Sequence, residues 1–236
     1  MNFQKGEIIA IDKPYRISSF KALAHVRYLL SHKLNHRVKI GHAGTLDPLA
    51  TGVLVLCTGK KTKEIEQLQT HIKEYTATLQ LGATTASYDM EHPVNETFPT
   101  EHITKDLVEE VLQQFVGEIQ QVPPTYSAVK VNGDRAYALR RAGEEVKLKP
   151  KTVRVDEIEL TDYDDTKKTA SIRVVCGKGT YIRSLARDIG RALNSGAYLT
   201  ALRRTKAGDF AVENCIDYDH FQEWLDAQEI EEFSNN

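Results

Sequence analysis

Short apolar runs alternate with helical patterns along this chain of 236 residues, and the alternation limits the folds open to it. Apolar or alternating runs bounded by turn residues predict strands at 6–11, 52–57, 75–81, 153–160 and 171–175. Apolar residues at helical spacing, preceded by capping residues, predict helices at 19–30, 104–115 and 180–193. Because neither element dominates, we expect an α+β fold.

Composition indicates an ordinary globular protein. With 41% hydrophobic and 27% charged residues, the chain can form one large domain or two small ones. It has no apolar run long enough to cross a bilayer and no signal peptide, so we expect a cytoplasmic protein. Its three cysteines lie far apart, which argues against disulfides and zinc, and His32 and His36 have no evident third ligand.

Charge is unevenly distributed, although the net charge is only −2. Residues 13–39 hold seven Lys or Arg and no acid, and residues 171–208 hold eight against the single acid Asp188. Residues 209–236 carry nine Asp or Glu and no Lys or Arg. The pattern predicts a basic face for phosphates and an acidic face toward solvent; the alternative is two solvated faces that happen to cluster.

One carboxylate stands in a glycine-rich stretch, residues 41–54, which reads GHAGTLDPLATGVL. Pro48 disfavours a helical conformation at Asp47, while Gly41 and Gly44 permit a tight turn or a close approach. Taken alone, Asp47 could be an ordinary turn residue.

The whole stretch resembles the catalytic motif of the TruB family of tRNA pseudouridine-55 synthases. Further blocks occur in the family's order and extend the resemblance over most of the chain: 12–14 with 18–20, 73–75 with 79–82, 123–130, 179–185 and 202–204. The chain departs from the pattern in three places, of which the third is the expected lack of a C-terminal PUA domain. Arg16 stands where the family commonly has Gly, and residues 83–89 read ATTASYD where the family usually has T-D-T-x-D.

The resemblance implies an isomerase that makes pseudouridine-55 in the TΨC loop of tRNA, with Asp47 as the catalytic residue. Whether Asp47 attacks the sugar carbon or abstracts a sugar proton stays open. Tyr75 is expected to stack on the extruded base and assist proton removal, Arg183 to pair with Asp47, and His42 to fill the gap that the flipped uridine leaves. The expected pocket walls are Tyr181 and Leu202.

The family also implies a pseudouridine synthase fold, with a mixed, largely antiparallel central sheet flanked by helices and an inserted RNA-binding thumb loop at 123–150. We expect one catalytic domain over 1–236, an acidic C-terminal tail at 209–236 and no C-terminal PUA domain. RNA phosphates are expected to contact Arg203, Arg204, Lys147 and Lys149.

We expect a monomer that acts on the tRNA TΨC stem-loop without a cofactor, a metal, a membrane or an obligate protein partner. Two alternatives remain: a synthase for another RNA, and a tRNA-binding folding chaperone whose cellular role does not need catalysis.

Overall fold

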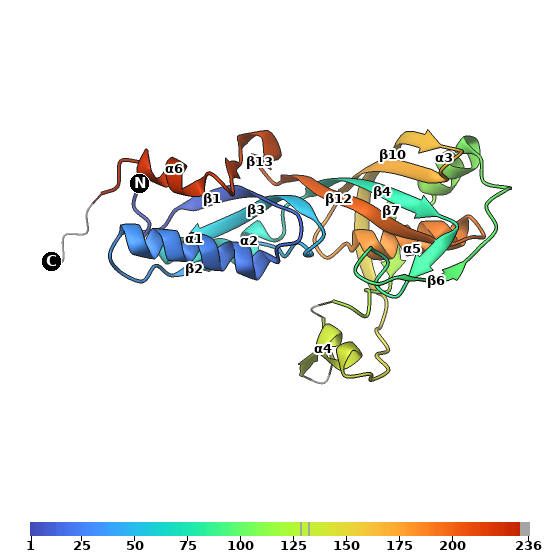
Figure 1. The fold of residues 1–236 in the computed structure, drawn as a ribbon, viewed down its shortest axis with the longest axis horizontal. Helices are drawn as coiled ribbons and strands as arrows, with labels where there is room; N and C mark the ends of the chain where they lie inside the picture. The colour runs from blue at the N-terminus through green and yellow to red at the C-terminus, as the bar shows by residue number, and fades with distance from the viewer. Residues whose placement is uncertain (128, 132, 232–236) are drawn as a thin grey trace. The chain divides into compact units, whose positions relative to one another are not determined.

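The computed structural model describes residues 1–127, 129–131 and 133–231, and the chain in it forms two compact units. Unit 1 combines Met1–Glu74 with Arg203–Asn236, and unit 2 is Tyr75–Leu202. The boundary falls inside the strands β4 (Lys73–Leu81) and β12 (Ala197–Ala207), each of which continues from one unit into the other (Figure 1). This division does not test the expected single catalytic domain, which stays a prediction.

Unit 1 contains a sheet with the strand order β14, β1, β3, β12. Strands β1 and β3 are antiparallel, whereas β14 and β12 run parallel to their partners β1 and β3. The other unit 1 pairs, β2 with β3 and β13 with β12, are antiparallel. Its elements are β1 (Ile8–Lys13), α1 (Ser19–Lys33), β2 (Ile40–His42), β3 (Thr51–Thr58), the 3₁₀ helix Gly59–Glu64, α2 (Ile65–Leu68), β13 (Phe210–Ala211), the 3₁₀ helix Val212–Asn214, β14 (Ile216–Asp217) and α6 (Phe221–Asp226).

Helix α1 begins where the sequence predicts, and Ser18 is its cap. The Ser18 hydroxyl accepts a hydrogen bond from the Lys21 backbone N–H at 3.2 Å, which satisfies one of the open donors of the first turn. The buried face of the helix packs in the unit 1 core, which includes Ala22, Val26 and Leu30 of α1, Ile9 and Ile11 of β1, and Leu54 and Leu56 of β3.

The C-terminal segment, predicted as an acidic tail at 209–236, is folded over the described residues 209–231. Strand β14 pairs with β1, and Phe221 and Leu225 of α6 are fully buried in the unit 1 core. The acids of α6 lie on its other faces, where Asp226 pairs with Lys33 at 2.7 Å. The acidic composition of this segment gave no indication of the short helix α6, which buries Phe221 and Leu225.

Unit 2 contains the strand order β12, β4, β11, β10, β7. Strands β10 and β11 form a long antiparallel hairpin, and β7 extends it antiparallel to β10. The remaining elements are β5 (Ala83–Thr85), β6 (Val94–Thr97), α3 (Lys105–Gln113), β7 (Gly117–Gln121), β8 (Lys130–Val131), β9 (Asp134–Arg135), α4 (Ala136–Arg141), β10 (Lys151–Asp164), β11 (Thr169–Cys176) and α5 (Ile182–Ala192). The α+β class with a largely antiparallel sheet is confirmed.

The predicted thumb at 123–150 contains the two-stranded sheet β8–β9 and the helix α4, drawn below the unit 2 sheet in Figure 1. Lys147 and Lys149 follow α4 in an irregular stretch, and both are exposed. No helix among the described residues has the length and apolar character that a membrane span requires.

Candidate active site

Asp47 lies in a loop between β2 and β3. The Ala50 N–H donates to the Asp47 carbonyl at 3.1 Å, which closes a turn over Pro48 and Leu49. Gly52, at the start of β3, has φ +103°, and a Cβ there would lie 2.2 Å from the Arg204 carbonyl oxygen. Only glycine fits at that position, so the motif glycine allows β12 to pair closely with β3.

Three side chains from three elements hold the backbone of the Asp47 loop. The Ser19 hydroxyl of α1 accepts from the Leu46 N–H at 2.8 Å and donates to the Leu46 carbonyl at 2.9 Å. The Lys13 ammonium of β1 donates to the Pro48 carbonyl at 3.5 Å. The Arg204 guanidinium of β12 donates to the carbonyls of Gly44 at 3.3 Å and Val53 at 2.8 Å. The backbone of this loop is thus fixed on both sides of Asp47.

Lys13 is a fully buried cation that the sequence alone left without a firm role. It also donates to the carbonyls of Pro14 at 2.9 Å and Ile17 at 2.6 Å, across the turn that contains Arg16. Arg16 has φ +64°, the left-handed conformation that glycine adopts more easily, so the turn is kept although the glycine is not. Burial lowers the pKa of Lys13 to about 8, against the opposing effect of the Asp47 negative charge.

His42 ends β2, and its side chain is partly buried. Burial and then the positive charge of Arg204 lower its pKa, partly offset by the Gly44 backbone. Its Nδ1 atom is enclosed and has no hydrogen-bond partner of ordinary geometry among the described residues. A neutral imidazole with an unsatisfied nitrogen is suited to contact with a ligand.

Arg203 and Arg204 have opposite environments although they are neighbours. Arg203 is partly exposed and forms a bidentate pair with Asp12, with N···O distances of 3.1 and 2.6 Å. Arg204 is only 1% exposed, because its guanidinium is used to hold the Asp47 loop. This burial does not fit the predicted contact between Arg204 and an RNA phosphate, so that prediction is withdrawn.

Unit 2 contains a second cluster, centred on the buried side chain of Arg183 in α5. Its guanidinium lies 3.7 Å from the Asp89 carboxylate and donates to the backbone carbonyls of Ser87 at 3.3 Å and Tyr126 at 3.0 Å. The Ser87 hydroxyl also donates to the Asp89 carboxylate, at 2.5 Å. Sequence reasoning missed Asp89 because residues 83–89 depart from the expected motif. Only its match to the last acid of the family's T-D-T-x-D motif marks Asp89 in the sequence.

Comparison with models of protein families shows to which family this chain belongs. A model described as the TruB family pseudouridylate synthase N-terminal domain matches residues 31–182, and one described as the tRNA pseudouridylate synthase B C-terminal domain matches residues 183–233. The chain belongs to the TruB family. The resemblance carried by the Asp47 motif is therefore confirmed.

Several curated members of the TruB family match the chain over nearly its whole length. "tRNA pseudouridine synthase B" of Bacteroides thetaiotaomicron is 59% identical, with 100% of both chains covered. The protein of the same name from Phocaeicola vulgatus is 58% identical, again with 100% of both covered. That of Flavobacterium johnsoniae is 52% identical over 94% of this chain and 97% of its own.

Two similar solved structures come from larger assemblies. A chain in "Crystal Structure of a Cbf5-Nop10-Gar1 Complex" is 31% identical with a TM-score of 0.70 and covers 96% of this chain. One in "Structure of H/ACA RNP bound to a substrate RNA containing 2'-deoxyuridine" is 29% identical with a TM-score of 0.65, also over 96%. This chain spans 58% and 57% of those two chains.

The predicted site residues of this TruB chain fall into both units. Unit 1 holds Asp47 and His42 on the β2–β3 segment, with Arg203 and Arg204 on β12. Unit 2 holds Arg183 and Asp89 together. It also holds the buried Tyr75 of β4, the partly buried Leu202 of β12, and Tyr181 at the start of α5, whose backbone exchanges two hydrogen bonds with the Gln121 side chain.

Within the described part of the chain, no group of three or more His, Cys, Asp or Glu side chains is arranged to hold a metal ion. Cys57 and Cys176 are buried thiols, and burial raises the pKa of Cys57 to about 11. A buried thiol with a raised pKa is a poor nucleophile at neutral pH, so Cys57 is a core residue.

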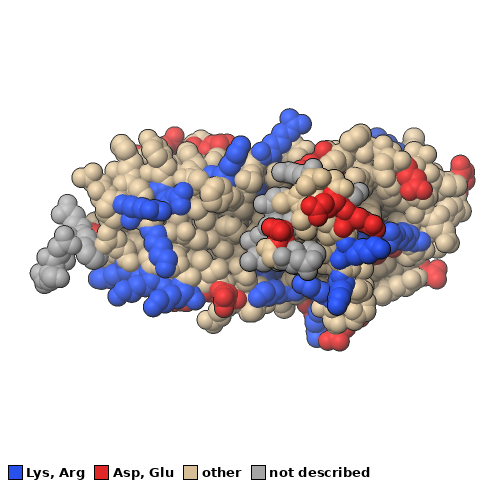
Figure 2. All heavy atoms as spheres, turned by 90° about the horizontal axis from the view of Figure 1, so that it is seen from below, with Lys and Arg blue, Asp and Glu red and all other residues tan. Residues whose placement is uncertain are grey.

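The two basic segments of the TruB chain also differ once they are folded. In 13–39, Arg16, Lys21, Arg37 and Lys39 are exposed, and Figure 2 shows Lys and Arg spread over the part of the surface that holds α1. In 171–208, by contrast, the guanidinium groups of Arg183 and Arg204 are buried and donate to backbone carbonyls. Arg173 and Arg203 remain partly exposed, and each is paired with acids. The prediction that both segments present their charge to RNA is therefore corrected for Arg183 and Arg204 of the second segment.

Proposed function

We propose that this chain converts uridine-55 of tRNA into pseudouridine. The observation that carries the proposal is the full-length identity of 59% and 58% with proteins named tRNA pseudouridine synthase B. The Asp47 loop supports it, because it presents one partly buried carboxylate on a backbone held by Lys13, Ser19 and Arg204.

The reaction needs no oxidant or reductant. The C1′–N1 bond of the uridine breaks, the base turns, and a C1′–C5 bond forms; C5 then loses its proton and N1 gains one. The sugar passes through an electron-poor state, so an Asp carboxylate can contribute either as a nucleophile at C1′ or as a base toward a sugar proton. We assign this role to Asp47, with both alternatives open.

The other residues serve the extruded base. Unstacking the base costs a few kcal/mol, and a planar group that fills the gap offsets part of this cost. His42 suits that task because its lowered pKa keeps the imidazole neutral at pH 7. We assign the stacking face of the base pocket to Tyr75, its walls to Tyr181 and Leu202, and the alignment of Asp47 to Arg183.

We further propose that the exposed Lys147 and Lys149 contact tRNA phosphates in the TΨC stem-loop. We also propose that the protein is a cytoplasmic monomer and that it acts without a cofactor or an obligate protein partner.

The decisive experiment incubates the purified chain with unmodified tRNA and maps pseudouridine by carbodiimide chemistry or mass spectrometry. Asp47→Asn should lower the isomerisation rate by at least about a thousandfold, the scale of removing an essential catalytic group, while tRNA affinity stays within a few-fold because phosphate contacts dominate binding. Asp209→Asn, which alters an exposed acid of unit 1, is the matched control and should keep full activity.

Two results would favour the alternatives. Modification at another position, or only in another RNA, would favour the second synthase hypothesis, which the likeness to a chain from an RNP bound to substrate RNA supports. A strain that carries Asp47→Asn and grows normally where the deletion strain does not would favour a chaperone role.

Activity in an excess of EDTA tests whether the reaction requires a metal. A short stem-loop substrate separates this requirement from the effect of magnesium on tRNA folding.

A further inference from the structure

A cavity of about 580 Å³ opens in unit 2 between α5, the β5–β6 segment and the two ends of the thumb segment 123–150. Its volume lies within the range of roughly 300–1,000 Å³ that is usual for small-molecule sites. Lining residues used below are Tyr88, Arg187, Arg191, Glu96, Glu145 and Thr125. None of them has a role in the function proposed above.

Arg187 is the fixed cation of this cavity, and it is only 7% exposed. Its Nε and Nη2 atoms donate to the Asp188 carboxylate at 2.8 and 3.1 Å, and Nη2 also donates to the Val122 carbonyl at 3.0 Å. The two N–H groups of Nη1 have no acceptor among the described residues. A nearly buried guanidinium with one open edge is ready to receive an anion, because its geometry is already set.

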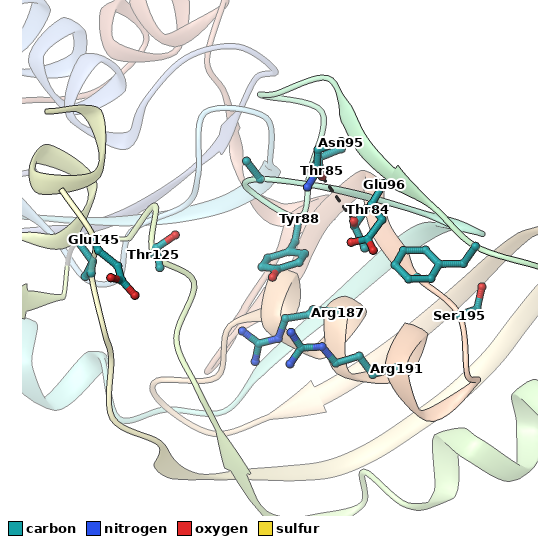
Figure 3. Close-up of a pocket in the computed structure, with 14 residues that line it drawn as sticks. Thr84, Thr85, Tyr88, Asn95, Glu96, Thr125, Glu145, Arg187, Arg191 and Ser195 are labelled. Carbon is teal, nitrogen blue, oxygen red and sulfur yellow. Dashed lines mark hydrogen bonds between the residues drawn. The ribbon is translucent and has the colours of Figure 1, made fainter. Parts of the chain in front are cut away.

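Arg191 follows one turn later on α5, and the two guanidinium groups project from the helix into the same space (Figure 3). Arg191 is exposed and has no ion pair within the described ranges. Since i and i+4 side chains share one helix face, a single phosphate can contact both arginines.

Tyr88 adds an aromatic surface beside the two cations. The Arg187 guanidinium lies over its ring at 5.4 Å from the centroid. The Tyr88 backbone has φ +59°, which is a strained conformation for a bulky residue. Such strain is retained where the surrounding structure or a function requires the orientation, and here the ring faces the cavity (Figure 3).

We propose that this cavity binds a phosphorylated nucleoside, with the phosphate held between Arg187 and Arg191 and the base against Tyr88. The source is either a free mononucleotide or one nucleotide of a bound RNA strand. Bases stack on aromatic rings with little regard to sequence, and arginine is the preferred partner of phosphate.

The two carboxylates of the cavity fit this ligand better than they fit inorganic phosphate. Glu96 lies beside β5, and Glu145 lies with Thr125 on the wall across from the arginines (Figure 3). Carboxylates repel a bare anion but accept hydrogen bonds from ribose hydroxyls and base amino groups. They therefore orient the phosphate toward α5 and the nucleoside away from it.

Calorimetric titration of the full chain tests the proposal with AMP, UMP, inorganic phosphate and a single-stranded oligouridylate. Arg191→Ala and Tyr88→Asn are the informative variants, since Arg191 is exposed and Asn tolerates a positive φ. Lys105→Ala removes an exposed cation of unit 2 that does not line the cavity, and it serves as the control. Thermal unfolding shows that each variant is folded.

Arg191→Ala should weaken binding by about tenfold or more, the usual effect of losing a charged hydrogen bond, and Lys105→Ala should not. A parallel loss with AMP or UMP identifies a free mononucleotide; a loss with the oligouridylate alone identifies an RNA nucleotide. If no ligand responds to Arg191→Ala, the site is refuted. If inorganic phosphate binds as tightly as AMP, or Tyr88→Asn changes nothing, the nucleoside part is refuted. Isomerase activity is measured separately. Failure of nucleotide binding therefore leaves the proposed function intact, and loss of the proposed function leaves the cavity proposal intact.

Discussion

Buried cations are the residue-scale feature that most distinguishes the folded chain from its sequence. Lys13 and Arg204 have 0% and 1% exposure, and both direct their donors at backbone carbonyls around Asp47. Burying a charge is unfavourable unless hydrogen bonds compensate for the lost water. Their position indicates that they hold the Asp47 loop.

Lys13 should make stability depend on pH in the alkaline range. Its pKa falls from 10.5 to about 8 on folding, so between these values the unfolded chain binds a proton that the folded chain has released. The free energy of unfolding should therefore rise with pH above about 8, by at most about 3 kcal/mol. Urea titrations from pH 7.5 to 10 check this, and Lys13→Met should flatten the rise. An equal rise in the variant would assign it to other groups.

Arg204→Met should destabilise the protein far more than Arg203→Met. Loss of the Arg204 guanidinium leaves the carbonyls of Gly44 and Val53 without donors in a buried position, which costs roughly 3 kcal/mol or more. Arg203 is partly exposed, and its pair with Asp12 contributes about 1 kcal/mol or less. Denaturant unfolding of both variants measures the difference. Equal losses would contradict the assigned structural role of Arg204.

Sequence could identify Asp47 but could not separate Arg203 from Arg204. The motif around Asp47 is local, because glycine, proline and the apolar run that follows dictate a loop before a strand. Burial of Arg204 depends instead on the register of β12 against β3, where Arg204 is paired with Gly52, and that pairing joins residues far apart in the chain.

At the scale of elements, capped helices and alternating strands were predictable, while segments rich in charge were not. Helix α3 begins after Thr104, whose hydroxyl accepts from the Leu107 N–H at 3.2 Å, as predicted from its capping pattern. Strand β12 was not expected, because Arg203, Arg204 and Lys206 interrupt its apolar character. Tertiary pairing overrides local composition there.

Helix α5 illustrates the same limit and leads to a prediction about Asp89. Its sequence could not show that Arg183 is buried beside Asp89. Removing one partner of a buried pair leaves the other charge uncompensated, at a cost of about 3–5 kcal/mol. Asp89→Asn should lower stability by this order and reduce kcat through loss of Arg183 alignment. A double-mutant cycle with Arg183→Met measures the coupling, and strictly additive effects would rule the pair out.

At the scale of the whole molecule, the two basic segments 13–39 and 171–208 carry similar charge in the sequence but expose it to different extents in the folded chain. Both basic segments read alike in sequence, but the second buries Arg183, Arg187 and Arg204, whereas 13–39 keeps every cation except Lys13 at least partly exposed. Counterion release follows surface charge that meets phosphate, so the first segment should dominate the salt dependence of RNA binding.

Lys21→Ala combined with Arg37→Ala should therefore reduce the salt dependence of binding to a TΨC stem-loop. Both residues are exposed. If each contacts one phosphate, the slope of log affinity against log salt should fall in magnitude by about 1.5 between about 50 and 200 mM salt. Fluorescence anisotropy gives the slope. Lys105→Ala with Lys167→Ala removes the same charge from exposed positions of unit 2 that already face acids, so its slope should match the unmodified chain. An equal fall in both pairs would mean that RNA responds to net charge alone, and residues 13–39 would then have no special role in binding.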